Sequence, residues 1–142
     1  MARRDPTDFI DTFGTVRRRI TALAGAAYAE ADVGSMQAKL VRHIGRHSPI
    51  SQAELARRTQ SDPTLTSRTL VALEERGLVR RERSEEDRRE YVLELTAAGR
   101  RLCDRIETLR TQLAARVVAV LDERDLEAFD RIAAKILNAF PE

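Results

Sequence analysis

The sequence predicts a mainly α-helical chain with one small β-hairpin. Apolar residues recur at helical spacing over most of the 142 residues. Typical capping residues precede several of these runs. One region near residue 90 instead alternates apolar and polar side chains beside a charged stretch, as a hairpin does. The expected order is four helices, the hairpin and two further helices.

The first two helices are indicated by spacing. Apolar side chains follow a helical pattern from about residue 6 to residue 30. Gly34 and Ser35 interrupt this pattern, and a second helical run continues from Met36 through Ile44. We therefore expect two amphipathic helices.

The next two helices are indicated by their ends. Ser51, followed three residues later by Glu54, predicts a reciprocal capping box at the start of a short helix. Asp62 is a suitable N-cap for the following helix, with Pro63 at its first position. Gly77 suits the left-handed turn that ends this helix.

The hairpin and the last two helices complete the chain. The runs GLVRRER and YVLEL read as strands that flank the charged tip SEEDRRE. Thr96 can cap a long helix whose apolar face reaches Val117. Asp122 can start a final helix that ends near Phe140.

The length of 142 residues suits either one domain with a core of its own or one small domain with an appended oligomerisation element. Hydrophobic residues make up 42% of the chain, aromatic residues only 4%, and Trp is absent, so an aliphatic core is expected. The net charge of +2 makes the placement of charges more informative than their total. No apolar run suits a membrane span or a signal segment, so we expect a soluble, cytoplasmic protein without a membrane partner.

Two short helices followed by a hairpin are typical of a winged helix-turn-helix, a DNA-binding arrangement. The second helix of such a pair fits the major groove, and its first turns face the base edges. Polar residues alone are common at any helix start for capping reasons. An arginine-bearing hairpin beside them favours DNA binding, although nearby acids offset much of its charge. Helical geometry leaves these residues toward the exposed side: Pro63, Thr64, Leu65, Ser67, Arg68 and Val71.

The stretch QAELARRTQSDPTLTSRTLVALEERGLVRRERSEEDRREYVLELTAAGRRL resembles the MarR family of dimeric winged-helix transcription regulators. Its most specific part is EDRR followed by LTAAGR, and the similarity in element order covers essentially the whole chain. The resemblance implies a single MarR-like chain over residues 1–142 with a winged helix-turn-helix lobe at 35–95. Residues 1–30 and 96–142 would form a helical dimerisation region.

The resemblance also implies which residues contact DNA. The Asp-x-Arg signature of the family falls on Asp87-Arg88-Arg89, so Arg89 would enter the minor groove while Asp87 orients the wing. Which of Leu65 and Thr66 faces DNA is open, and Leu65 could meet a thymine methyl group. The expected DNA-binding residues are Thr64, Leu65, Ser67, Arg68, Arg88 and Arg89.

Family members often bind small phenolic or lipophilic effectors between the DNA-binding lobe and the dimerisation helices. By resemblance, candidate pocket residues in this chain are Phe13, Arg17, Tyr28, Met36, Leu40 and His43. Each could equally be an ordinary core or surface residue.

The sequence does not favour an enzyme or a metal site. His43 and His47 are the only histidines, and no further ligand stands near them at metal-binding spacing. The single Cys103 is expected to be a buried structural residue and not a redox sensor. No cofactor is expected.

These observations predict a sequence-specific DNA-binding transcriptional regulator. We expect a homodimeric repressor on a pseudo-palindromic operator of double-stranded DNA, with release by a small aromatic or lipophilic effector as a further expectation. The alternative is a winged-helix protein-interaction module without DNA binding. A wing without exposed arginine would favour that alternative.

Overall fold

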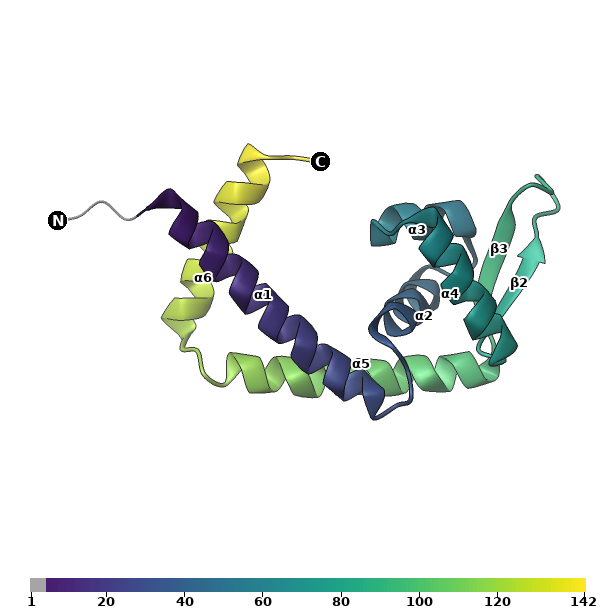
Figure 1. Cartoon of the computed structure of the whole chain (residues 1–142), viewed down its shortest axis with the longest axis horizontal. Helices are drawn as coiled ribbons and strands as arrows, with labels where there is room; N and C mark the ends of the chain where they lie inside the picture. The colour runs from purple at the N-terminus through teal and green to yellow at the C-terminus, as the bar shows by residue number, and fades with distance from the viewer. Residues whose placement is uncertain (1–4) are drawn as a thin grey trace. The chain divides into compact units, whose positions relative to one another are not determined.

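The computed structural model describes residues 5–142 and confirms the mainly helical fold with a small wing (Figure 1). The first four residues of the expected dimerisation region lie outside this range. The chain consists of two compact units. The first ends at Arg110, and the second is formed by Thr111–Glu142. The elements are α1 (Pro6–Ala29), α2 (Ser35–His47), β1 (Ile50–Ser51), α3 (Gln52–Thr59), α4 (Pro63–Glu75), β2 (Val79–Arg83), β3 (Tyr91–Leu95), α5 (Ala97–Val118) and α6 (Glu123–Ala139).

The sheet has three antiparallel strands in the order β1-β3-β2. In the β2–β3 hairpin, Val79 lies opposite Leu95 and Arg83 lies opposite Tyr91. The short strand β1 pairs with the other edge of β3, with Ile50 opposite Leu93. Strand β1 was not predicted from the sequence, because two residues are too few to show an alternating pattern.

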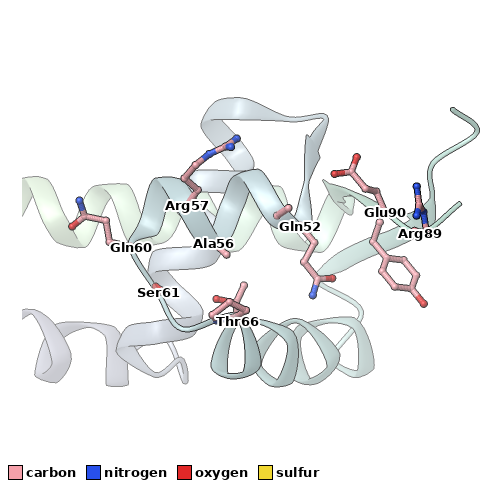
Figure 2. Close-up of a pocket in the computed structure, with 11 residues that line it drawn as sticks. Gln52, Ala56, Arg57, Gln60, Ser61, Thr66, Arg89 and Glu90 are labelled. Carbon is pink, nitrogen blue, oxygen red and sulfur yellow. The ribbon is translucent and has the colours of Figure 1, made fainter. Parts of the chain in front are cut away.

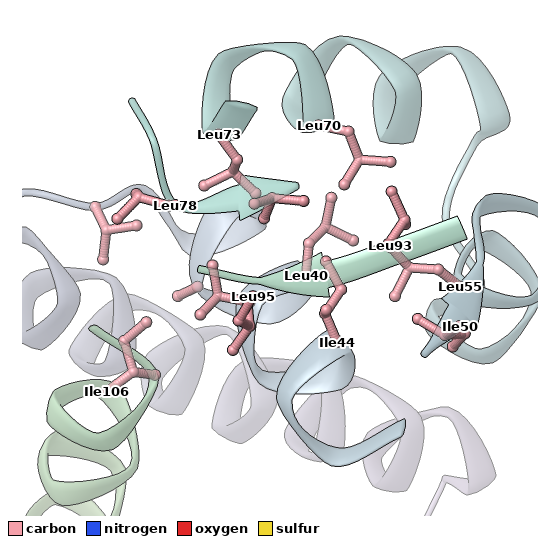
Figure 3. Close-up of a cluster of buried hydrophobic side chains, with 14 of the residues drawn as sticks. Leu40, Ile44, Ile50, Leu55, Leu70, Leu73, Leu78, Leu93, Leu95 and Ile106 are labelled. Carbon is pink, nitrogen blue, oxygen red and sulfur yellow. The ribbon is translucent and has the colours of Figure 1, made fainter. Parts of the chain in front are cut away.

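The core of the first unit is aliphatic, as its composition predicts (Figure 3). Side chains from α2, α3, α4, the sheet and α5 meet in one cluster. Burial of each large side chain stabilises the fold by about 1.5–3 kcal/mol relative to exposure. The fully buried members include Leu40, Ile44, Leu55, Leu70, Leu73, Leu93 and Ile106.

The predicted ends of α4 are confirmed. The Asp62 carboxylate accepts a hydrogen bond of 2.9 Å from the Leu65 amide, and Pro63 is the first helical residue. Gly77 has a φ of +70°, a left-handed conformation that favours glycine. Both ends of the helix are therefore determined by local chemistry.

The predicted reciprocal capping box of α3 is only half formed. The Ser51 hydroxyl accepts a hydrogen bond of 3.1 Å from the Glu54 amide. The Glu54 carboxylate, however, pairs with Arg57 and Arg58 and not with the Ser51 amide. These cations lie one turn away on the same helix and compete for the carboxylate. A complete reciprocal box occurs instead at the start of α6, between Asp122 and Asp125.

The junction between the sheet and α5 is a close approach of two backbones. The Thr96 hydroxyl accepts a hydrogen bond from the Gly99 amide at 3.1 Å and donates one to the Gly77 carbonyl at 2.6 Å. The Thr96 amide donates to the Leu78 carbonyl at 3.1 Å. A Cβ atom on Gly99 would overlap that same Leu78 oxygen. The fold therefore requires glycine here for space.

An ion-pair cluster joins α2 to α5. The Nε atom of Arg42 lies 2.8 Å from Oε1 of Glu107, and the guanidinium groups of Arg46 and Arg110 lie 3.6 and 3.5 Å from the same carboxylate. Burial raises the pKa of Glu107, but the Arg42 hydrogen bond and the three positive charges outweigh burial. The pKa of Glu107 therefore lies below its usual value.

Apolar side chains remain exposed in both units, each considered by itself. One row lies on α1 and consists of Phe9, Ile10, Phe13, Val16, Ile20 and Leu23. Another set lies on α6 and at the C-cap position that follows it, and consists of Phe129, Ile132, Ile136, Leu137 and Phe140. Among the described residues, no helix combines the length and apolarity that a membrane crossing requires.

The substitution Gly99→Ala should lower the free energy of unfolding by about 2–3 kcal/mol, because the new Cβ atom forces two backbones apart. The control Gly14→Ala places its Cβ 3.5 Å from the flexible end of Arg18, which is an ordinary contact. Its effect should stay within about 1 kcal/mol. Urea denaturation at one protein concentration compares the two variants, and equal stabilities would contradict the close approach.

The substitution Glu107→Gln should lower the free energy of unfolding by about 1 kcal/mol at pH 7, since Arg42 loses its ionic partner. Because the folded-state pKa of Glu107 is depressed, this contribution is complete above its usual pKa of 4.5 and disappears as pH falls through the lower folded value. The difference from the parent protein should therefore shrink in acid. Urea titrations over a pH series measure it, with exposed Glu85→Gln as the control.

Candidate nucleic-acid interface

Helix α4 presents Leu65 to solvent and buries Thr66. The exposed fraction is 49% for Leu65 and 0% for Thr66. The buried Thr66 hydroxyl is satisfied, because it donates a hydrogen bond of 2.9 Å to the Asp62 carbonyl. Of the two residues between which the sequence left a choice, Leu65 therefore faces solvent and Thr66 faces the core.

The exposed face of α4 centres on Arg68. Thr64, Leu65, Arg68 and Val71 are all exposed, while Ser67 is half-buried. Within the described residues, the Arg68 side chain forms no ion pair or hydrogen bond, so its five N–H groups are available to a ligand. This face combines one free guanidinium group with two apolar side chains at its edges.

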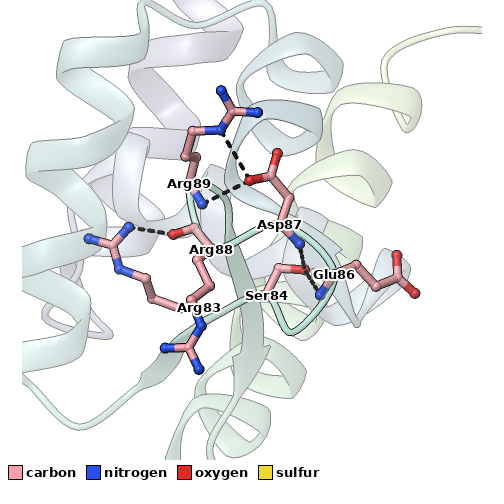
Figure 4. A network of polar contacts seen from close by, with 6 residues as sticks. All are labelled: Arg83, Ser84, Glu86, Asp87, Arg88 and Arg89. Atoms are coloured by element: carbon pink, nitrogen blue, oxygen red, sulfur yellow. Dashed lines mark hydrogen bonds and ion pairs between the residues drawn. The ribbon is translucent and has the colours of Figure 1, made fainter.

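The tip of the wing is a loop held by its own side chains (Figure 4). The Ser84 hydroxyl accepts hydrogen bonds from the amides of Glu86 at 3.2 Å and Asp87 at 3.3 Å. The Glu90 amide donates to the Asp87 carbonyl at 2.9 Å and closes a turn. The charged tip is therefore an ordered turn as well as a solvated one.

Asp87 holds Arg89 at both its backbone and its side chain. One carboxylate oxygen of Asp87 accepts from the Arg89 amide at 3.0 Å and from Arg89 Nε at 3.3 Å. The Arg89 side chain is nevertheless 92% exposed. Its two terminal nitrogens have no partner within the described residues, so their N–H groups are free to donate hydrogen bonds to a ligand. The neighbouring Arg88 side chain is exposed as well.

A cavity of about 700 Å³ separates the wing from α3 and the start of α4 (Figure 2). Its lining surface is mainly apolar but includes two guanidinium groups, Arg57 from α3 and Arg89 from the wing. Such a lining can accept an anionic backbone. The labelled lining residues are Gln52, Ala56, Arg57, Gln60, Ser61, Thr66, Arg89 and Glu90.

Most arginines of the lobe are already paired with acids. Arg80 lies 3.3 Å from Glu94, and Arg81 lies 3.8 Å from Glu74. Among the described arginines of residues 35–95, the side chains of Arg68 and Arg88 have neither an ion pair nor a hydrogen bond. The lobe thus has a few free cations at defined places and no general basic patch.

The six candidate effector residues do not gather around this cavity. Tyr28, Met36 and Leu40 belong to or pack against the aliphatic core. Phe13 and Arg17 are exposed on α1. His43 is half-buried on α2, and its Nδ1 atom has no hydrogen-bond partner in the described structure. Burial and the neighbouring cations hold the pKa of His43 below its usual value.

Cys103 is half-buried and lies against Gly45, where a Cβ atom would come within 2.8 Å of the cysteine Sγ. Burial and nearby carboxylates raise the pKa of the Cys103 thiol, which disfavours the reactive thiolate. In the described part of the chain, no group of three His, Cys, Asp or Glu side chains is arranged to hold a metal ion.

The site also includes residues on α3 and on the inner side of the wing that the sequence did not predict. Gln52, Arg57, Gln60 and Tyr91 line the cavity. Arg81 lies behind this lining and contacts Gln52 and Tyr91. Strand alternation places Arg81 on the same face as core residues. That alternation was the one available signal for its inward position.

Sequence comparisons agree with the resemblance seen in the motifs. A family model described as MarR family matches residues 31–90. An uncharacterized HTH-type transcriptional regulator of Staphylococcus aureus is 30% identical over 95 residues, which are 67% of this chain and 65% of that protein. The HTH-type transcriptional regulator BilQ of Clostridium symbiosum is 27% identical over 68% of this chain and 67% of its own. The chain thus spans just under two thirds of the Staphylococcus relative.

Comparison with solved structures supports the fold over nearly the whole chain. A crystal structure of MarR superposes with a TM-score of 0.78 at 24% identity, covering 98% of this chain and 93% of that one. A Staphylococcus aureus MepR–DNA complex gives 0.83 at 19% identity, with coverages of 93% and 98%. A mutant Escherichia coli MarR complexed with operator DNA gives 0.82 at 21% identity, with coverages of 94% and 99%.

Proposed function

The chain belongs to the MarR family, and from that premise we propose that it is a sequence-specific DNA-binding transcriptional regulator and not an enzyme. One observation carries the proposal. Arg89, aimed by Asp87, and Arg68, on the exposed face of α4, both present free guanidinium nitrogens to solvent. Two such groups in one winged lobe suit a ligand that offers base edges and phosphates together.

In this proposal α4 enters the major groove. Arg68 donates to a guanine, whose O6 and N7 atoms match a guanidinium group, or to the backbone. Leu65 contacts a thymine methyl group, which explains an exposed leucine on the first turn of a helix. Thr64 and Ser67 supply further hydrogen bonds near the helix start.

The wing contacts a neighbouring part of the same DNA. Arg89 enters the minor groove or neutralises a phosphate, and Arg88 adds a second cation beside it. Asp87 fixes the loop without consuming the terminal nitrogens of Arg89. A protein-interaction module without DNA binding would have no need of this arrangement.

The regulator acts as a homodimer that represses transcription from a pseudo-palindromic operator. Exposed apolar side chains on α1 and α6 would be buried against a second copy of the chain, because exposing such rows to water is unfavourable in free energy. A two-fold dimer places its half-sites about one helical turn apart, roughly 10 bp. Release by a small aromatic or lipophilic effector stays a prediction of the family resemblance.

The substitution Arg89→Ala should weaken operator binding by about 1–3 kcal/mol and flatten its salt dependence, because one phosphate or groove contact is lost. Asp87→Ala should weaken binding less, since the arginine remains but is no longer held. Fluorescence anisotropy at several salt concentrations measures both effects on a duplex selected by the parent protein. The control Arg101→Ala removes an exposed arginine from α5. Unchanged curves for Arg89→Ala would mean that the wing charge serves only solubility.

The protein should sediment and scatter light as a dimer at micromolar concentration. Ile136→Glu places a charge in the exposed apolar set of α6 and should shift the protein toward monomer or unfolding. The matched control Asn138→Glu adds the same charge on the opposite side of that helix and should leave the dimer intact. A folded monomer from the parent protein would disprove the dimer.

A further inference from the structure

Arg81 occupies an unusual position for a charged residue of the wing. Its side chain is only 16% exposed, although it lies on a two-stranded hairpin. Three groups surround its guanidinium: Nη1 donates to Gln52 Oε1 at 3.4 Å, Nε lies 3.8 Å from Glu74 Oε2, and Cζ lies 4.3 Å from the centre of the Tyr91 ring. One residue of β2 thus touches α3, α4 and β3.

Strand alternation separates Arg81 from its neighbour Arg80. Arg80 lies on the other face of β2, is 57% exposed, and pairs with Glu94 and Glu82 on that outer face. Arg81 lies opposite the buried Leu93 and therefore points to the side on which α3 and α4 pack. The two adjacent arginines have the same charge but different roles.

The contacts of Arg81 continue to the tip of the wing. The guanidinium carbon of Arg83 lies 4.7 Å from the same Tyr91 ring centre. Arg83 also donates a hydrogen bond to the Arg88 carbonyl, next to Arg89 (Figure 4). A connected set of side chains therefore runs from α3 and α4, through Arg81 and Tyr91, to the loop that holds Arg89.

From this geometry we propose that Arg81 is a positioning residue that sets the angle of the wing against α4. Beyond the two residues of β1, the outer end of the β2–β3 hairpin has only two strands and little stability of its own, so contacts outside its ladder must hold its direction. The planar guanidinium group suits this role, because it can stack on a ring while its edges bond to other groups. By fixing the angle of the wing, Arg81 allows Arg68 on α4 and Arg89 on the wing to contact the same DNA site. This inference rests on the proposed function.

The test compares Arg81→Gln with Arg80→Gln, each in the parent protein and in the Arg89→Ala variant. Both substitutions remove one positive charge from the same strand, so their long-range electrostatic effects match. Affinity is measured by fluorescence anisotropy on a DNA duplex that the parent protein selects from a random library. Arg81→Gln should lower affinity about 3- to 30-fold in the parent protein, and Arg80→Gln should have almost no effect.

In the Arg89→Ala background, Arg81→Gln should cost little further affinity, because the contact that it positions is already gone. Tyr91→Leu, which changes no charge, should reproduce this pattern. Additive losses in both backgrounds would overturn the proposal and identify Arg81 as an independent DNA contact. Equal losses for Arg80→Gln and Arg81→Gln would also overturn it, since total charge alone would then explain the effect.

Hydrogen exchange separates failure of this inference from failure of the proposed function. The Ser84 and Glu90 amides are hydrogen-bonded in the wing. Without DNA, Arg81→Gln should speed their exchange while the core amides of α2 keep their protection. If the parent protein selects no DNA, the proposed function fails, and this exchange measurement still tests whether Arg81 holds the wing. Unchanged exchange at both wing amides would overturn the positioning role.

Discussion

The alternation of side chains on β3 is the constraint on which the winged lobe depends. Leu93 and Leu95 face the aliphatic core, so every second residue of the hairpin must face the same side. This places Tyr91 at the outer end of the buried row. Opposite it, β2 directs Arg81 and Arg83 to that same face. The polar contacts that support the wing therefore lie on the same face of the sheet as the hydrophobic core, next to its outer end. A shift of one residue in register would expose the leucines and turn the supporting arginines away from α3 and α4.

The lobe uses arginine in two distinct ways. Some guanidinium groups are structural, such as Arg42 at the α2–α5 junction and Arg81 beneath the wing, and each is paired with a carboxylate. Others are free, notably Arg68 and Arg88. Arg89 belongs to both classes, because Asp87 holds its Nε atom while the terminal nitrogens stay exposed. The net charge of +2 reflects this division and says little about binding capacity.

Local chemistry made much of this structure predictable. The ends of α4 followed from Asp62, Pro63 and Gly77, whose preferences need no tertiary context. The family resemblance implied that Asp87 orients the wing, and its carboxylate does bond to Arg89 within the loop. Other features were not predicted, because they depend on competition between side chains for one partner or on packing between distant elements. The Glu54 carboxylate pairs with Arg57 and Arg58 and not with the Ser51 amide. The three contacts of Arg81 come from elements that are distant in sequence. The choice between Leu65 and Thr66 needed the position of the core.

The two faces of α4 are chemically independent. On the inner face, the Thr66 and Thr69 hydroxyls donate to carbonyls one turn earlier, so neither depends on the outer side chains. Leu70 and Leu73 complete the packing on that side. Thr64, Leu65, Arg68 and Val71 can therefore be exchanged with little consequence for folding. This separation gives the helix an evolvable surface, on which paralogues or engineered variants could acquire new targets while the scaffold beneath stays unchanged.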